Sequence, residues 1–455
     1  MFRRILLASV ALAPLSAPAF AACSDAKPAD GTVVICTGTD TKGVKNKDAN
    51  GVSVTIAAGA SVSNAAKTDN HVIHLNDDAI ISVQGTLTST SVKDAINLVD
   101  NARVTIDGTV SAPDPDSDGV QAENGLSLTI LEGGTISAGK KGVNGGDGNG
   151  STVTNHGTII AGTEGIELGD DGSILNTGTI TAKDDAINAG ENATIVNTGT
   201  IHSVQDDLGI DFVQDGIDID SGRVVNSGLI QSDDDAAIDF DATRAPELAS
   251  VITNSGRILG AAGIIVETGH NDDGSLNGEA ANTAAQRVYN LAGGRIEATS
   301  GPALKLGAGD DGYFGAAGSV LVGAADLGQG DDLFALEAGA MVSGDVRMGE
   351  GADVLSFSGL FGGAGLGLFD GGLGTDVVSF AGYLRSDISS LSWSDDILGL
   401  TFADGFALSL TSFETVTLGT RSYTLSELMP AVPLPAPLLM LGSALGGLAL
   451  LRRRR

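Results

Sequence analysis

Two groups of aspartates in this 455-residue chain have residue types and spacing that could do chemistry. The first group occupies the segments Asp215-Gly-Ile-Asp-Ile-Asp220 and Asp233-Asp-Asp-Ala-Ala-Ile-Asp239. Two carboxyl groups that flank a glycosidic bond can protonate the leaving oxygen and activate a water molecule. The carboxyl groups of these two segments are therefore candidates for acid–base chemistry on a sugar chain.

The second group lies in four loops that combine glycine with aspartate. The loops begin at Gly307, Gly328, Gly349 and Gly371, which are 21, 21 and 22 residues apart. Glycine lets backbone carbonyls turn inward and aspartate supplies a hard oxygen, both of which suit Ca²⁺. The predicted calcium ligands are Asp331, Asp332, Asp353 and Asp376. The same pattern also fits glycine turns in which each aspartate caps the next backbone amide, and the sequence leaves both interpretations open.

Other motifs with a known chemistry are absent from the sequence. It contains no phosphate-binding loop, no His/Cys cluster with metal-ligand spacing and no Gly-x-Ser-x-Gly elbow. The five histidines are scattered along the chain at His71, His74, His156, His202 and His270, and separate surface positions suit them.

The elements that must position the aspartates follow from a repeated phrase, Asn-x-Gly-x-Ile. It occurs six times between residues 155 and 296, and the closest copies start 21 residues apart. The copies start at Asn155, Asn176, Asn197, Asn226, Asn254 and, with an inserted residue, Asn290. Weaker copies precede them at Gly59, Gly85, Gly108 and Gly134. A fixed period of this size is typical of stacked structural repeats.

Each repeat also contains a second short alternating phrase, such as Asp185-Ala-Ile-Asn-Ala189. Short aliphatic runs closed by glycine indicate strands separated by tight turns. The sequence therefore predicts an all-β protein, a right-handed parallel β-helix of about thirteen coils. Two internal columns are expected, Ile159, Ile180, Ile201, Ile230 and Ile258 in one and Ile166, Ile187, Ile217, Ile238 and Ile264 in the other. The phrase asparagines are expected to bond one another from coil to coil.

The chain divides into six predicted segments. These are a signal peptide at 1–21, an N-terminal cap at 22–42, the Asn-phrase coils at 43–306, the Gly-Asp coils at 307–380, a β-rich C-terminal cap at 381–428, and a linker with a sorting segment at 429–455. The first segment is basic, then apolar, and ends in small residues, so cleavage is expected after Ala21. Cys23 and Cys36 are predicted to form a disulfide in the cap, with lipidation of Cys23 as the alternative.

The C-terminal segment has three parts in a fixed order. Val432-Pro433-Leu434-Pro435-Ala436 precedes an apolar stretch at 437–451, and four arginines end the chain. This arrangement resembles the VPLPA-type variant of the PEP-CTERM sorting signal of Gram-negative bacteria. The resemblance implies a hydrophobic sorting helix held transiently in the inner membrane, cleavage by an exosortase-type protease, and delivery to the cell surface or an extracellular polysaccharide matrix.

Three further resemblances concern the body. The repeats are similar to the passenger regions of autotransporter adhesins, which implies a structural or adhesive role. The segment 371–379 resembles the calcium-binding nonapeptide of RTX repeats. The first aspartate group resembles the paired-Asp region of polygalacturonase-type hydrolases, with Asp215, Asp234, Asp235 and His270 as the implied catalytic set. However, 269–271 and Arg295-Ile-Glu297 match that family only in part.

Charge limits the partners of the chain. Lys and Arg number 25 against 57 Asp and Glu, a formal net charge of −32. Such a surface repels nucleic acid and favours divalent cations. We therefore expect a structural or adhesive surface protein that is not an enzyme, associated with polysaccharide and stabilised by Ca²⁺. The alternatives are a β-helix carbohydrate-active enzyme and a calcium-dependent binding module.

Overall fold

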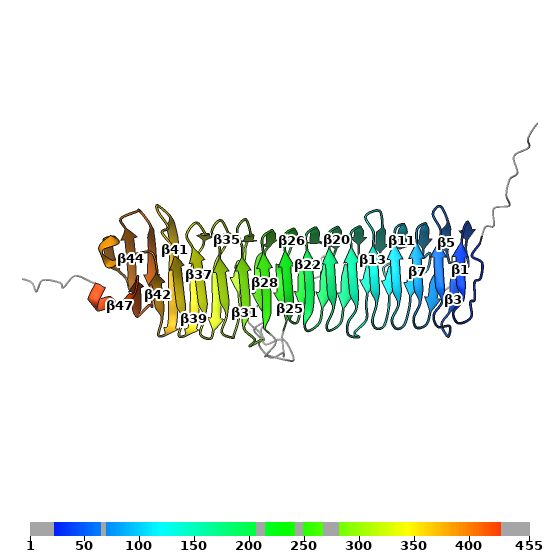
Figure 1. Ribbon diagram of the computed structural model, residues 1–455, viewed down its shortest axis with the longest axis horizontal. Helices are drawn as coiled ribbons and strands as arrows, with labels where there is room; N and C mark the ends of the chain where they lie inside the picture. The colour runs from blue at the N-terminus through cyan, green and yellow to red at the C-terminus, as the bar shows by residue number, and fades with distance from the viewer. Residues whose placement is uncertain (1–21, 65–69, 206–213, 242–248, 267–281, 429–455) are drawn as a thin grey trace, which may run out of the picture.

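The protein is a parallel β-solenoid, a rod in which the chain coils around one long axis (Figure 1). The computed structural model describes residues 22–64, 70–205, 214–241, 249–266 and 282–428. Each coil contributes one strand to each of three sheets, here called A, B and C. The 13 strands of sheet B correspond to the predicted number of coils, and the predicted fold class is confirmed.

Sheet A forms the face that Figure 1 presents. Its 17 strands are, in chain order, β1 (Val33–Cys36), β4 (Ser53–Ile56), β7 (Ile80–Val83), β10 (Arg103–Ile106), β13 (Ser127–Ile130), β16 (Thr152–Asn155), β19 (Ser173–Asn176), β22 (Ala193–Asn197), β25 (Gly222–Asn226), β28 (Ser250–Asn254), β31 (Gln286–Asn290), β34 (Gly312–Gly315), β37 (Leu333–Glu337), β40 (Val354–Ser358), β42 (Val377–Phe380), β46 (Thr415–Leu418) and β47 (Arg421–Thr424).

Sheet B follows sheet A in each coil after a short turn. Its strands are β2 (Thr39–Asp40), β5 (Ser61–Ser63), β8 (Thr86–Thr88), β11 (Thr109–Ala112), β14 (Thr135–Ala138), β17 (Thr158–Ile160), β20 (Thr179–Ala182), β23 (Thr200–Ser203), β26 (Leu229–Ser232), β29 (Arg257–Gly260), β32 (Arg295–Ala298), β35 (Val320–Val322) and β38 (Met341–Ser343).

Sheet C completes the coil. Its strands are β3 (Val44–Asn46), β6 (Ile73–Leu75), β9 (Ile96–Asn97), β12 (Val120–Gln121), β15 (Val143–Asn144), β18 (Ile166–Leu168), β21 (Ile187–Ala189), β24 (Ile217–Ile219), β27 (Ala236–Phe240), β30 (Ala262–Val266), β33 (Leu304–Lys305), β36 (Ala325–Gln329), β39 (Val346–Gly351), β41 (Gly365–Gly374), β43 (Ile388–Ser394), β44 (Ile397–Phe402) and β45 (Ala407–Thr411).

The core is built from columns of identical aliphatic side chains. Strands of successive coils pair in parallel with equivalent residues opposite each other, so Ile180 lies between Ile159 and Ile201 in sheet B. The same holds for Ile187 and Ile217 in sheet C. All ten isoleucines of the two predicted columns are fully buried. One coil cannot bury an apolar face alone, so stacking supplies the stability of the rod.

The phrase asparagines form the expected ladder. Asn155, Asn176 and Asn197 are fully buried, and the Nδ2 of each donates to Oδ1 of the next asparagine at 2.8–2.9 Å. The ladder continues through the remaining copies and ends where Asn290 donates to the hydroxyl of Tyr313 at 3.2 Å. An amide is both donor and acceptor, so a stack of amides satisfies itself.

The ends of the rod differ from its middle. At the N-terminus Cys23 and Cys36 form the predicted disulfide. At the C-terminus the strands β43, β44 and β45 pair antiparallel, as do β46 and β47. The short helices η1 (Arg385–Asp387) and α1 (Leu425–Leu428) also lie there. Within the described residues, no helix is long and apolar enough to span a membrane. The predicted signal peptide at 1–21 and sorting helix at 437–451 lie outside these residues.

The aliphatic column predicts a strong position dependence for one substitution. Ile201→Asp places a carboxylate on a fully buried side chain, whereas Ile160→Asp makes the same change at a side chain that is 47% exposed. We expect Ile201→Asp to lower the free energy of unfolding by about 3 kcal/mol or more, because the buried charge has no partner. For Ile160→Asp the loss in free energy of unfolding should be well under half of that value. Chemical denaturation of both variants measures the difference, and equal losses would contradict the column.

Candidate functional site

The Gly-Asp loops stack at the corner where sheet C gives way to sheet A. Three glycines there, Gly330, Gly351 and Gly374, have φ angles of 138°, 155° and 148°. A Cβ atom on each would lie 1.9, 1.8 and 1.6 Å from the carbonyl oxygen of the equivalent glycine in the preceding coil. Only glycine therefore permits the close stacking that brings the loop aspartates into one column.

The column, here called the aspartate ladder, consists of Asp311, Asp332, Asp353 and Asp376, each at most 1% exposed. In each of the last three, Oδ1 accepts the backbone N–H of the preceding member, at 2.7, 2.8 and 3.0 Å. The Oδ1 of Asp311 accepts from the backbone of Gln286 at 2.6 Å, and the N–H of Asp376 donates to Oε2 of Glu414 at 2.7 Å. The aspartates thus cap amides, as one sequence interpretation predicts.

The second oxygen of every ladder carboxyl is buried without a hydrogen-bond partner. Burying a carboxylate without a compensating partner costs free energy, so the protonation equilibrium shifts towards the neutral carboxylic acid. Burial accordingly raises the pKa of Asp311 to about 8, of Asp332 to about 7 and of Asp376 to about 6. Burial raises the pKa of Asp353 as well. Asp311 and Asp332 are therefore largely protonated under mildly acidic conditions.

Asp331 does not belong to the ladder. Its side chain is exposed and its Oδ1 accepts the N–H of Ala352 at 2.8 Å, while its own N–H donates to Asp310 at 3.0 Å. The side chain of Asp331 therefore lies at the surface, whereas the three aspartates with which it was expected to share calcium are buried. Within the described segments, no group of three or more acidic, histidine or cysteine side chains is arranged to hold a metal ion. Calcium binding at these loops stays a prediction.

The first aspartate group occupies sheet C and the corner before it. The Oδ1 of Asp185 accepts the backbone N–H of Asp215 at 2.8 Å, which links two successive coils. Asn188 donates to Oδ2 of Asp218 at 2.7 Å and to Oδ2 of Asp185 at 3.4 Å. The Oδ1 atoms of Asp215 and Asp218 are buried without a hydrogen-bond partner. These contacts define an acidic cluster of Asp185, Asn188, Asp215 and Asp218.

The electrostatics of the acidic cluster favour neutral carboxyl groups. Burial and the charges of Asp239 and Asp185 raise the pKa of Asp215 well above its usual range. Burial and the charge of Asp241, followed by that of Asp185, do the same for the pKa of Asp218. Burial raises the pKa of Asp185 to about 7. Groups with such shifts can act as general acids near neutral pH.

The implied catalytic set is only partly brought together. Asp235 lies near enough to add to the charge acting on Asp215. Asp234 is exposed, and its Oδ1 accepts from Gln205 at 3.3 Å. His270 lies outside the described residues. The sequence interpretation missed Asp185, Asn188 and Asp218, although the repeated second phrase places Asp185 and Asn188 in the rows of Asp215 and Asp218.

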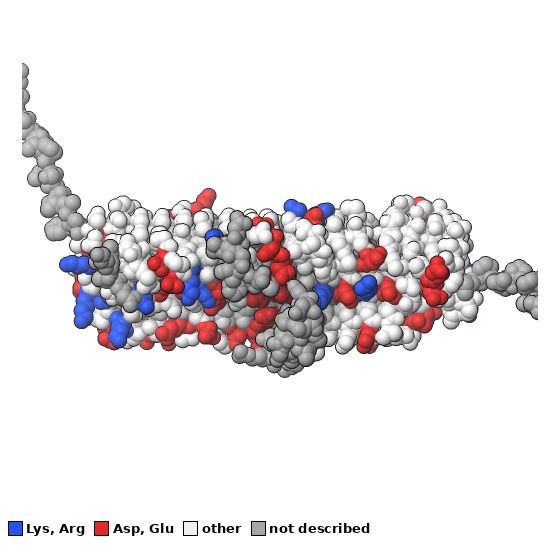
Figure 2. All heavy atoms as spheres, turned by 180° about the vertical axis from the view of Figure 1, so that it is seen from behind, with Lys and Arg blue, Asp and Glu red and all other residues white. Residues whose placement is uncertain are grey.

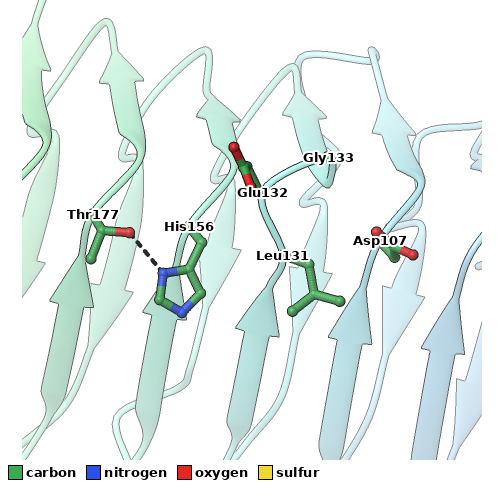
Figure 3. Close-up of a pocket in the computed structure, with 6 residues that line it drawn as sticks. All are labelled: Asp107, Leu131, Glu132, Gly133, His156 and Thr177. Atoms are coloured by element: carbon green, nitrogen blue, oxygen red, sulfur yellow. Dashed lines mark hydrogen bonds between the residues drawn. The ribbon is translucent and has the colours of Figure 1, made fainter.

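A hollow of about 910 Å³ lies along the turns between sheets A and B (Figure 3). It forms because the turn 131–134 is two residues longer than the turns 107–108 and 156–157 on either side. Glu132 and Asp107 line it, and the ring of His156 bonds Oγ1 of Thr177 at 2.7 Å. The described contacts pair His156 with a threonine rather than with either carboxylate, so the hollow contains no assembled acid–base pair.

Comparisons with known proteins return no match: no family model, no curated protein and no solved structure is detectably similar to the chain.

The aspartate ladder predicts stability that changes with pH. The folded-state pKa of Asp332 is about 7, above the value of about 3.9 in an unfolded chain. Its contribution to stability is therefore complete below pH 4 and is lost as the pH rises through 7. Asp332→Asn keeps the Oδ1 acceptor and removes the charge. We expect the melting temperature of this variant to be roughly 2 °C higher than that of the parent at pH 8. At pH 4 the two melting temperatures should be equal.

Asp331→Asn is the matched control, since it makes the same change at the exposed neighbour and should leave the melting temperature nearly unchanged at both pH values. A change in melting temperature in Asp332→Asn that is the same at both pH values would contradict the raised pKa of Asp332. The same assay tests calcium. Binding at the ladder would raise the melting temperature of the parent in Ca²⁺ relative to chelator, by less in Asp332→Asn.

Proposed function

We propose that the protein is an exported structural or adhesive scaffold of the cell surface or of an extracellular polysaccharide matrix. The observation that carries this proposal is the continuity of the rod, in which one pattern of strand pairing runs from β1 to β46. Thirteen coils at about 4.8 Å each make a spacer of about 60 Å. A rigid rod of this kind offers long outer rows of side chains to an extended partner.

The chemistry of the outer faces supports a carbohydrate partner. Outward positions of sheets A and B are rich in threonine and serine, as in the column Thr158, Thr179 and Thr200. Hydroxyl side chains both donate and accept hydrogen bonds, which suits the hydroxyl groups of sugars. Figure 2 shows acidic side chains distributed over the opposite face of the rod, with basic ones concentrated towards its N-terminal end. Such a surface disfavours nucleic acid.

The terminal segments supply the proposed location. A signal peptide ending at Ala21 would export the chain, and the VPLPA-type segment would be held briefly in the inner membrane. There an exosortase-type protease would recognise it. Neither segment belongs to the described residues, so the location of the mature protein follows from the sequence pattern alone.

Processing at both ends is the test of this location. Mass spectrometry of protein extracted from the cell surface should find a chain that lacks residues 1–21 and most of the segment after Ala436. Replacing Pro433 and Pro435 with Ala should leave the protein in the membrane fraction, because the sorting motif is then lost. Recovery of an intact tail ending in Arg452–Arg455 from the parent protein would indicate a permanent anchor instead.

A second candidate function is favoured by the acidic cluster. Burial and neighbouring carboxylates raise the pKa of both Asp215 and Asp218, and a protonated carboxyl group can assist cleavage of a glycosidic bond as a general acid. If the protein is a hydrolase, the parent should release reducing ends from polygalacturonate. Asp215→Asn should then lose at least about 100-fold in rate, because general acid catalysis of this kind contributes 10²–10⁴-fold.

Asp331→Asn is the control for this assay, since it removes one exposed carboxylate far along the rod. No release of reducing ends by the parent protein, at any pH between 4 and 8, would contradict the hydrolase candidate and leave the scaffold proposal standing.

A further inference from the structure

One outward row of sheet A changes abruptly in side-chain size. In this row Thr253 pairs with Tyr289, Tyr289 with Phe314, and Phe314 with Ala335. The row continues through Ser356, Ser379 and Thr417. Two aromatic side chains thus lie next to a run of small side chains on the following coils. The aromatic side chains form the wall of a depression in the surface, and the small side chains form its floor. A groove of about 380 Å³ lies at this step.

The wall of the groove is an aromatic ring supported by a second one. The rings of Tyr289 and Phe314 stack face to face with their centroids 4.7 Å apart and an interplanar angle of 11°. Tyr289, the fourth of the five residues of β31, is 36% exposed. Because stacked rings cover each other's facing sides, Phe314 presents to the groove the face on the side of Ala335, and Tyr289 supports Phe314 from the other side. Leu291 lines the same groove and is also exposed.

The floor and rim of the groove supply hydrogen-bonding groups. Ala335 and Ser356 form part of the floor, and Ser358 and Glu337 line the side nearest the turn into sheet B. One carboxylate oxygen of Glu337 accepts the N–H of Ala317 at 3.1 Å, which fixes the position of this side chain. The lining therefore combines a flat apolar surface with a few oriented polar groups, as small-ligand sites do.

Charge narrows the class of ligand. Among the described residues that line the groove, Glu337 alone is charged, and it is negative. The chain as a whole carries a formal net charge of −32. An anionic ligand is therefore repelled, and no cation lines the described groove to pair with a carboxylate or phosphate. A neutral ligand with one apolar face and several hydroxyl groups suits the groove.

From this geometry we propose that the groove binds a neutral sugar ring of a polysaccharide chain. The apolar face of the sugar ring stacks on the free face of Phe314, and its hydroxyl groups bond Ser356, Ser358 and Glu337. Neighbouring sugars of the chain lie over the row of small residues that continues through Ser379 and Thr417. This inference rests on the proposed scaffold function and names the site and the chemical class of its ligand.

The test compares binding of the full-length protein to neutral and acidic polysaccharides. Dextran, galactomannan and xyloglucan serve as neutral probes, and alginate and polygalacturonate as acidic ones, in affinity electrophoresis. We expect at least one neutral polysaccharide to bind and Phe314→Ala to weaken that binding about tenfold, since stacked aromatic contacts of this kind contribute on that order. Phe314→Tyr keeps the ring and should bind within about twofold of the parent.

Two further variants separate binding from folding. Ala335→Phe fills the floor of the groove while leaving Phe314 and Tyr289 in place, and it should weaken binding as Phe314→Ala does. Leu175→Ala removes a side chain that is 37% exposed in the same outward row, several coils away, and should leave binding unchanged. Melting curves that coincide with the parent's establish that each variant is folded.

The outcomes also distinguish this inference from the scaffold proposal. Equal binding by the parent, Phe314→Ala and Ala335→Phe would overturn the groove while leaving a polysaccharide-binding scaffold. Binding of acidic polysaccharides alone, or of none, would also overturn the groove. The location of the protein at the surface, tested separately, would still stand. In the expected case, saturation-transfer NMR should detect the protons of one face of the sugar ring in the parent and lose them in Phe314→Ala.

Discussion

The structure depends on one constraint: successive coils pair in parallel with equivalent residues opposite each other. Every side chain therefore has its own counterpart from the next coil as a neighbour, about 4.8 Å away. Residue types that pack or bond well with copies of themselves are favoured at every position. Isoleucine meets this condition in the interior, and Thr158, Thr179 and Thr200 meet it on the outside. The repeated phrase in the sequence is the result of this requirement.

The two polar ladders show how differently the constraint acts on an amide and on a carboxyl group. Asn176 accepts from Asn155 and donates to Asn197, so each rung satisfies the next. A carboxylate only accepts, so Asp332 bonds a backbone N–H with one oxygen, and its other oxygen is buried without a partner. An aspartate column therefore has a cost at neutral pH that an asparagine column lacks. The stability of the Gly-Asp coils therefore depends on pH.

Candidate functions arise where the repeat is broken. Tyr289 and Phe314 interrupt an outward row of smaller residues, and a groove forms beside them. Asp215 and Asp218 lie where acidic residues of successive coils gather, and burial together with those neighbouring charges raises the pKa of both. A uniform stack is stable but presents the same surface at each level. A binding or catalytic site needs a level that differs from those around it, because only there can a ligand be held at one position along the rod.

The sequence by itself determined the period, the columns and the ladders. Once a period near 21 residues is known, parallel pairing decides which residues share a row, so the burial of Ile201 and the bonding of Asn197 to its neighbours could be predicted. The pairing of Cys23 with Cys36 was predicted on another ground, namely that an exported chain with two cysteines usually pairs them. The first two features depend on a residue's place in the repeat. A residue's place in the repeat follows directly from its position in the sequence.

The tertiary structure alone decided the direction and depth of side chains at the corners. Asp331 and Asp332 are adjacent in sequence, yet one is exposed and the other is buried. The left-handed backbone of the glycines beside them sets this difference, and the regular alternation of a strand does not extend into such a turn. The groove at Tyr289 likewise needs the heights of side chains from four separate coils. The period of the sequence decides which residues share a row. The burial of a corner side chain, an unpaired oxygen or a hollow depends on which other coils surround that residue in the folded protein.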